Sequence, residues 1–231
     1  MSAGPERRPI AVVTALPEEL EAIGALARDG LAVASSGDGP RNAARGAGAL
    51  CDAVRPAALI GAGVAGGLSP RLFAGSVVAS RRIVDGGGEA PRPDESLLAR
   101  AVAAGAAPAT LVTVSRPVAA AFAKAELARA FGADGGDAAA VDMESAAWSR
   151  AAAARGIPFL AVRAISDRVD EDLPDYLADC VGLDGGIRRA AVVRRALAHP
   201  RSIPALWRMR RRVEAAAAVL AEFLRTLLAQ A

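Results

Sequence analysis

The sequence predicts a single-domain α/β protein, a three-layer fold in which a central sheet, mostly parallel or mixed, is flanked by helices. Its 231 residues are enough for one such domain and its core. The apolar runs of strand length are continuous, which is typical of strands buried on both faces. Segments with helical spacing alternate with these runs, and this order indicates parallel strands joined by crossover helices.

The first predicted elements follow a polar arm at residues 1–8, which we expect to be disordered. The run IAVVTAL at residues 10–16 predicts a strand, and Pro17 opens a helix that Gly30 ends. A short strand and a Gly/Pro turn precede a second helix, which ends near Val54. The apolar side of the first helix carries Leu16, Leu20, Ile23 and Leu26.

The middle of the chain predicts four strands, two loops and two helices. The strands are expected at residues 57–64, 75–84, 110–118 and 159–165, and the loops at residues 85–95 and 132–139. One helix is expected at residues 119–131. Asp142 can cap the other, which ends at Gly156 and buries Met143, Ala146, Ala147 and Ala151.

The domain is predicted to span residues 9–200, followed by a basic amphipathic helix at residues 201–231 with six arginines and two glutamates. Two interpretations of this helix stay open. It packs on the sheet or on a dimer partner, or it is a peripheral membrane anchor in which Trp207 suits the interface. Its apolar positions at helical spacing are Leu206, Met209, Val213, Leu220, Leu224 and Leu227.

The composition excludes several classes of function. Aromatic residues are only 3% and no basic patch is interleaved with them, so we expect no nucleic-acid partner. His199 is the only histidine, and Cys51 and Cys180 lie far apart, so neither a histidine-based triad nor a metal site is indicated. Lys124 is the only lysine, which removes most candidates for Schiff-base chemistry. Catalysis should therefore depend on carboxylates, with no cofactor.

The expected location is the cytoplasm, because the N-terminus reads as a first strand and no run of 18 apolar residues exists. If the C-terminal helix binds lipid, the protein would lie at the inner membrane surface.

Three segments place carboxylates at the ends of elements: LPEELE with Glu19, VDMES with Asp142 and Glu144, and AISD with Asp167. Each also has an ordinary structural explanation. Acidic residues in a first helical turn complement the macrodipole, and aspartates cap helices and loops. Taken singly, none of these residues decides the function.

The segment GAGVAGGL has Gly61, Gly63 and Gly66 in the spacing G-x-G-x-x-G, and Asp85 follows at a suitable distance for a dinucleotide ribose. A dinucleotide site also needs a helix directly after the glycines. Pro70 and Gly75 leave too few residues for one. The sequence therefore argues against this interpretation.

In their order along the chain, three segments resemble the purine nucleoside phosphorylase and nucleosidase superfamily, and most closely its methylthioadenosine/adenosylhomocysteine nucleosidase branch. The segments are IAVVTALPEELEAI, GAGVAGGLSPRLFAGSVVAS and AVDMESAAWSRAAAARGIPFLAVRAISDRVD. The resemblance implies that the glycine segment lines a nucleoside pocket, with Val64, Ala65 and Gly66 close to the substrate.

The resemblance also implies a role for each carboxylate. Asp167, with Ser166 beside it, would protonate N7 of adenine, which is a poor leaving group otherwise. Glu144 would grip the ribose hydroxyls while Met143 packs under the sugar, and Glu19 would activate the attacking water. We expect a homodimer.

Phosphorylases of this superfamily carry a G-D-P-x-R loop after the first strand, where this chain has ALPEELE. An acidic turn repels phosphate, so water is the favoured nucleophile, although Arg41 keeps phosphate possible as co-substrate.

The finer resemblance is to the hopanoid-associated phosphorylase group, on the segments AGVAGGL, AVDMESAAW and AHPRSIPALWRMRRR. It implies release of adenine from adenosylhopane to leave ribosylhopane in hopanoid biosynthesis. The alternatives are a methylthioadenosine/adenosylhomocysteine or futalosine-type nucleosidase, a phosphate-dependent phosphorylase, and a nucleoside-binding module without catalysis.

Overall fold

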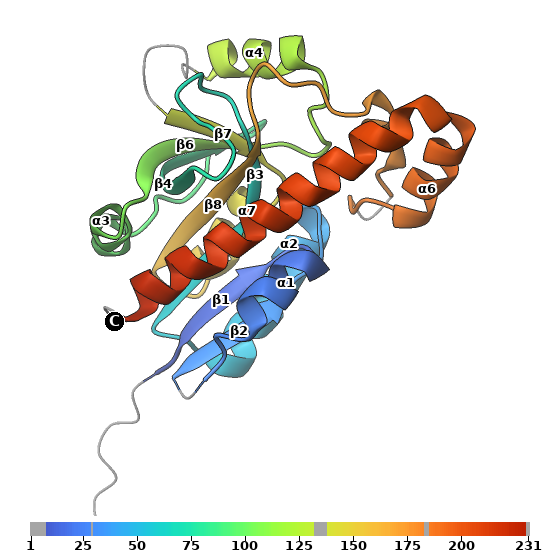
Figure 1. Cartoon of the computed structure of the whole chain (residues 1–231). Helices are drawn as coiled ribbons and strands as arrows, with labels where there is room; N and C mark the ends of the chain where they lie inside the picture. Colours follow the sequence, from blue (N-terminus) through green and yellow to red (C-terminus); the bar gives the residue numbers. More distant parts are fainter. Residues whose placement is uncertain (1–7, 29, 132–137, 183–184, 230–231) are drawn as a thin grey trace, which may run out of the picture.

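The computed structural model describes residues 8–28, 30–131, 138–182 and 185–229. Of the predicted disordered arm, only Arg8 lies within these ranges, and the predicted loop at 132–139 lies mostly outside them. The described residues form the α/β architecture that the sequence predicts, with the strands in one sheet and helices on both of its faces (Figure 1).

The sheet is mixed and closes on itself over part of its width. Parallel pairs join β1 to β2 and β3, β3 to β8, and β6 to β4 and β7. Antiparallel pairs join β3 to β7 and β4 to β8, so β3, β8, β4, β6 and β7 form a closed ring. The strands are β1 (Ile10–Thr14), β2 (Leu31–Ser35), β3 (Ala58–Gly67), β4 (Val77–Asp85), β5 (Gly88–Glu89), β6 (Ala107–Thr113), β7 (Ala138–Asp142) and β8 (Phe159–Asp167).

Two apolar cores fill the space between the sheet and its helices. One contains Trp148 with residues of α2 (Pro40–Val54) and α5 (Ser145–Ala153). The other joins α1 (Pro17–Gly24), α3 (Glu95–Ala103) and α7 (Ile203–Ala229) to the opposite face. A smaller core lies under α4 (Ala121–Ala130). The strands β1, β3, β6, β7 and β8 are therefore buried over most of both faces, which explains why their sequences are continuous apolar runs.

The last part of the chain forms a small unit with its own core. The 3-10 helices η1 (Asp175–Cys180) and η2 (Pro200–Ser202) lie with α6 (Arg189–Ala198) beside the start of α7 (Figure 1). Tyr176, Leu177 and Cys180 are buried there against partly buried neighbours that include Met209 of α7. The second half of α7 instead buries Leu220, Leu224 and Leu227 against the sheet.

Several expectations about individual elements are wrong. The first helix ends at Gly24 and not near Gly30, because the chain must turn back so that Arg28 can pair with Leu31. The loop expected at 85–95 contains β5, which pairs with β4. Ala138 and Ala139 belong to β7 and not to a loop.

The helix expected to begin at Asp142 begins at Ser145, and Asp142 is the last residue of β7. Met143 precedes the helix and is only partly buried, as is Ala147. Asp142 still accepts a hydrogen bond from the Ser145 N–H at 3.3 Å.

Candidate active site

β3 continues through the glycine segment as far as Gly67, three residues beyond the end of the strand predicted at 57–64. Each of its three spaced glycines leaves room for a neighbouring side chain. A Cβ at Gly61 would lie 2.5 Å from the Trp148 ring, one at Gly63 2.9 Å from Glu19 Oε1, and one at Gly66 3.1 Å from Asp167 Oδ2. The glycines therefore admit the protein's own side chains, two of them carboxylates, to the strand.

Glu19 both caps α1 and joins it to β3. Its Oε2 accepts hydrogen bonds from the N–H groups of Ala15 at 3.0 Å and Leu16 at 2.8 Å, and its Oε1 accepts one from Val64 at 2.8 Å. Burial nonetheless raises the pKa of this carboxyl above its ordinary value, because it is only 2% exposed. Glu19 thus combines the structural role considered from sequence with a position beside the glycine strand.

The end of β8 brings Ser166 and Asp167 to the same strand. Ser166 Oγ lies 2.7 Å from Asp167 Oδ1 and 3.3 Å from the carbonyl oxygen of Ala65, and its single proton is donated mainly to the closer Asp167. Asp167 Oδ2 receives a hydrogen bond of 2.5 Å from the ammonium of Lys124, which is fully buried. The base-side acid implied by the resemblance is therefore held by two donors.

Glu144 lies between the end of β7 and α5. Its Oε1 accepts a hydrogen bond from the Gly39 N–H at 2.9 Å. Burial, together with the negative charge of Asp142, raises the pKa of Glu144 to about 8. The charge of Glu19 contributes to the same shift, so the two glutamates lie within electrostatic reach of each other.

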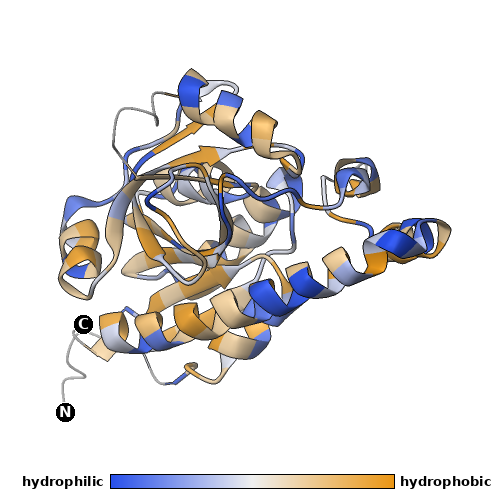
Figure 2. Ribbon diagram, turned by 45° about the horizontal axis from the view of Figure 1, so that its top comes forward, coloured by the Kyte–Doolittle hydropathy of each residue, from blue (hydrophilic) through white to orange (hydrophobic). Residues whose placement is uncertain are grey.

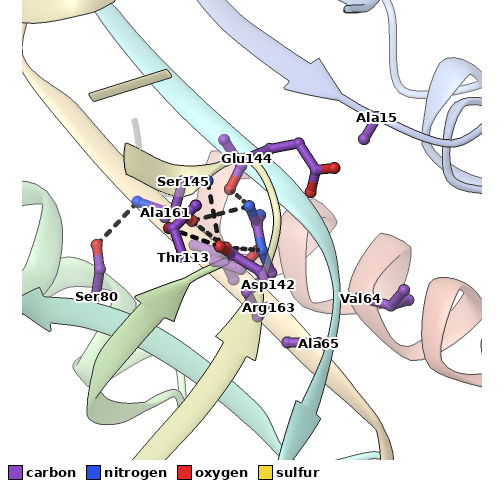
Figure 3. A network of polar contacts seen from close by, with 12 residues as sticks. Ala15, Val64, Ala65, Ser80, Thr113, Asp142, Glu144, Ser145, Ala161 and Arg163 are labelled. Atoms are coloured by element: carbon purple, nitrogen blue, oxygen red, sulfur yellow. Dashed lines mark hydrogen bonds and ion pairs between the residues drawn. The ribbon is translucent and has the colours of Figure 1, made fainter. Parts of the chain in front are cut away.

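A buried network lies behind Glu144 (Figure 3). Arg163 donates from Nε to Asp142 Oδ2 at 2.8 Å and from Nη2 to Ser145 Oγ at 2.8 Å. Thr113 Oγ1 donates to Asp142 Oδ1 at 2.8 Å, and the Arg163 guanidinium stacks 4.7 Å from the centre of the Trp148 ring. Asp142 is therefore a structural partner of Arg163, and this network fixes the strand end that carries Glu144.

The structure thus brings most of the predicted site residues to the carboxyl-terminal part of β3. Contacts along β3 link Glu19 to Val64, Ser166 to Ala65, and Asp167 to Gly66. Glu144 joins them through its proximity to Glu19, and Met143 precedes it. These contacts place the residues together, and the catalytic role of each residue stays a prediction.

Sequence reasoning missed three partners of these carboxylates: Lys124, Arg163 and Gly39. Lys124 is the only lysine of the sequence, and no other feature of the sequence pointed to it. Arg163 is the single charged residue inside the apolar run FLAVRAI. A charged residue inside a buried strand needs a buried partner, so that pattern could have indicated Arg163.

The acidic turn that argued against phosphate is partly neutralised. Glu18 accepts two hydrogen bonds from the Arg189 guanidinium, at 2.8 and 2.7 Å, and this ion pair lowers the pKa of Glu18. The argument against a phosphate nucleophile therefore rests on Glu19 alone.

The comparisons with known proteins agree with this architecture. The family model of the phosphorylase superfamily matches residues 22–225. The structure of futalosine hydrolase from Helicobacter pylori strain 26695 is 18% identical with a TM-score of 0.74, covering 97% of this chain and 99% of that chain. The comparison with curated proteins gave no significant match.

Two further solved structures share the fold. The 5′-methylthioadenosine/S-adenosylhomocysteine nucleosidase from Neisseria meningitidis, in complex with methylthio-immucillin-A, is 22% identical with a TM-score of 0.73, covering 97% of this chain and 100% of that chain. The S-adenosylhomocysteine nucleosidase from Streptococcus pyogenes is 20% identical with a TM-score of 0.74 and 99% coverage of both chains. Because the family model spans most of the sequence, the superfamily resemblance is confirmed: the chain belongs to the phosphorylase superfamily.

Proposed function

We propose that this protein is a nucleosidase that cleaves the N-glycosidic bond of an adenine nucleoside with water. The observation that carries the proposal is a set of three buried carboxyls: Glu19 and Asp167 contact the glycine segment of β3, and Glu144 lies within electrostatic reach of Glu19. Among the described residues Glu19 and Glu144 have no ion pair, and a buried carboxyl without one is costly to maintain unless it acts on a ligand.

Each carboxyl suits one part of the reaction. Asp167, in its protonated form, gives its proton to N7 of the base as the C1′–N9 bond breaks and the electron pair of that bond moves to the ring. Glu144 accepts hydrogen bonds from the ribose hydroxyls and stabilises the positive charge that develops on the sugar. Glu19 takes a proton from the water whose oxygen bonds to C1′, and burial raises the pKa of Glu19, which makes its carboxylate a stronger base.

A buried hydroxyl near Glu19 is further evidence that the site binds a polar ligand. Thr14 ends β1, one residue before the Ala15 amide that binds Glu19, and its side chain is 0% exposed. Its Oγ1 has no hydrogen-bond partner among the described residues. An orphaned buried hydroxyl is costly, and a bound water or nucleoside oxygen would satisfy it.

The finer proposal is that the nucleoside is adenosylhopane and the product ribosylhopane. It is supported by the resemblance to the hopanoid-associated group. The experiment is mass spectrometry of products from a panel containing adenosine, 5′-methylthioadenosine, adenosylhomocysteine, futalosine and adenosylhopane. If one of the soluble 5′-substituted nucleosides is turned over in preference to adenosylhopane, the lipid substrate is refuted. The proposed nucleosidase activity would still stand.

Ultraviolet detection of released base tests catalysis itself. No release from any member of the panel, with binding retained, would favour a nucleoside-binding module without turnover. The homodimer also remains a prediction, which sedimentation equilibrium would test.

A further inference from the structure

Arginine is concentrated at the end of the molecule formed by α6 and the first turns of α7. Residues 188–212 contain nine arginines and no aspartate or glutamate. Four of them reach carboxylates elsewhere in the chain: Arg189, Arg195, Arg210 and Arg212. The other five are exposed and have no carboxylate partner within the described ranges: Arg188, Arg194, Arg201, Arg208 and Arg211.

The same two helices expose large apolar side chains. Val193 is 56% exposed, Leu197 71% and Trp207 61%, which makes them three of the seven large apolar side chains exposed by the described residues. We call these three residues and the five unpaired arginines the arginine surface. Tryptophan and aliphatic side chains next to arginines are the composition of helices that lie in a membrane interface.

The position of this surface separates the two interpretations of the C-terminal helix. The last turns of α7 are covered by protein, since Leu220, Leu224 and Leu227 belong to the core. Its first turns extend past the sheet beside α6, and hydrophilic residues gather on this half in Figure 2. The anchor interpretation therefore applies to this projecting end of α7.

We propose that the arginine surface binds the anionic headgroups of a phospholipid bilayer, with Trp207 and Leu197 inserted at the interface. Five unpaired positive charges are complementary to an anionic partner, and exposed apolar side chains add affinity for a bilayer that a polyanion such as DNA would not use. No helix among the described residues is long and apolar enough to cross a membrane, so the contact would be peripheral. The proposal does not depend on which nucleoside is cleaved.

Tryptophan fluorescence of the full chain tests the proposal. The chain has two tryptophans, and Trp148 is fully buried, so a blue shift on adding vesicles would report Trp207. We expect the shift with vesicles of equal phosphatidylglycerol and phosphatidylcholine, and none with phosphatidylcholine alone. Replacing Arg194, Arg208 and Arg211 by serine should lower the partition coefficient about 100-fold, since each arginine contributes about fivefold.

A matched control removes the same charge elsewhere. Arg28, Arg92 and Arg116 are exposed, and their combined replacement by serine should change partitioning less than about threefold. Leu197→Ser should weaken binding without changing its salt dependence. Three results would each overturn the proposal. The two triple arginine variants could lose vesicle binding equally, the parent could fail to bind vesicles, or the parent could bind duplex DNA more tightly than vesicles.

A second inference rests on a different observation, the buried position of Lys124. Its ammonium group has three hydrogen-bond acceptors: Asp167 Oδ2 at 2.5 Å, the carbonyl of Arg168 at 2.9 Å and that of Glu171 at 2.8 Å. An ammonium has three N–H donors, so all are used and none remains for a substrate. We infer that Lys124 is a positioning residue, which fixes the Asp167 carboxylate and the segment after β8 against α4.

A double-mutant cycle tests this inference, which rests on the proposed function. Lys124→Met should lower kcat about 10- to 100-fold with KM almost unchanged, because a misplaced acid affects the chemical step most. In the Asp167→Asn background the same change should have no further effect on kcat. If Lys124→Met does not fold, Lys124→Gln, which keeps two N–H donors, replaces it in the cycle.

An equal loss in both backgrounds would show that Lys124 supports only the fold. A readout independent of activity separates this outcome from failure of the proposed function. Labelling with ¹⁵N-lysine gives a single Nζ signal, because Lys124 is the only lysine. We expect this signal to be protected from exchange and to shift in Asp167→Asn, and an unprotected signal would overturn the inference.

Discussion

Replacing Glu144 by glutamine should stabilise the protein at alkaline pH while lowering its activity. Glutamine has the same shape and can keep the hydrogen bond from the Gly39 N–H. It carries no charge at any pH, so it avoids both burial of a charge and repulsion by Asp142.

The size of the effect follows from the pKa of Glu144, which is raised from 4.5 to about 8 in the folded protein. A carboxyl with a raised pKa binds its proton more tightly in the folded state, so stability falls as pH rises from about 4.5 to about 8. Each pKa unit corresponds to about 1.4 kcal/mol, so the parent should lose about 2 to 3 kcal/mol relative to the variant between pH 6 and pH 9.

Urea unfolding of both proteins at pH 6 and pH 9 measures this difference directly. Glu126→Gln, which replaces an exposed glutamate, is the control. The difference between its free energy of unfolding and that of the parent should be the same at pH 6 and pH 9. If Glu144→Gln shows the same stability gap at both pH values, Glu144 is not a buried carboxyl of raised pKa. The variant should also lower kcat, because the sugar loses its carboxylate.

Four other outcomes are expected. Asp167→Asn should fold normally and lower kcat at least about 100-fold, measured by adenine release. Adenine should be released from adenosine in phosphate-free buffer; strict dependence on phosphate, with ribose 1-phosphate as product, would instead indicate a phosphorylase and a role for Arg41. Gly61→Ala should lower the urea midpoint by an amount equivalent to about 1 to 3 kcal/mol, because its Cβ would meet Trp148 at 2.5 Å. A chain ending at Arg201 should fail to give a cooperative thermal transition, since it lacks the core residues of α7.

The layered fold could be predicted because its evidence is local. Continuous apolar runs, Pro17 at a helix start and Gly156 after a helix end each reflect the conformation of a few neighbouring residues. The return of β8 to pair with β4, which closes part of the sheet, has no such local signal. It depends on contacts between segments distant in the sequence.

The same distinction applies to the site. The position of Asp167 at the end of an apolar strand made it a candidate from sequence, because ligands bind at the carboxyl ends of strands in α/β sheets, and the resemblance supplied its expected role. Its partner Lys124 lies 43 residues away on an unremarkable helix, and Gly39 lies 105 residues from Glu144. The glycine spacing was ambiguous for a related reason. Glycine permits a close approach without specifying what approaches, and here it is Trp148 and two carboxylates rather than a pyrophosphate.

The three site carboxyls differ in how well the protein compensates their burial, and we expect this difference to give them different parts in substrate binding. Glu19 accepts three backbone hydrogen bonds, and Asp167 has an ammonium and a hydroxyl. Glu144 has one backbone hydrogen bond from Gly39 and is repelled by Asp142, and its pKa is raised to about 8. The hydroxyls of a ribose would supply the missing donors, so the ionised form of Glu144 should become favourable only when a sugar is bound. Substrate binding should then lower the pKa of Glu144 and release a proton near pH 7, whereas a ligand that fills only the base position should not.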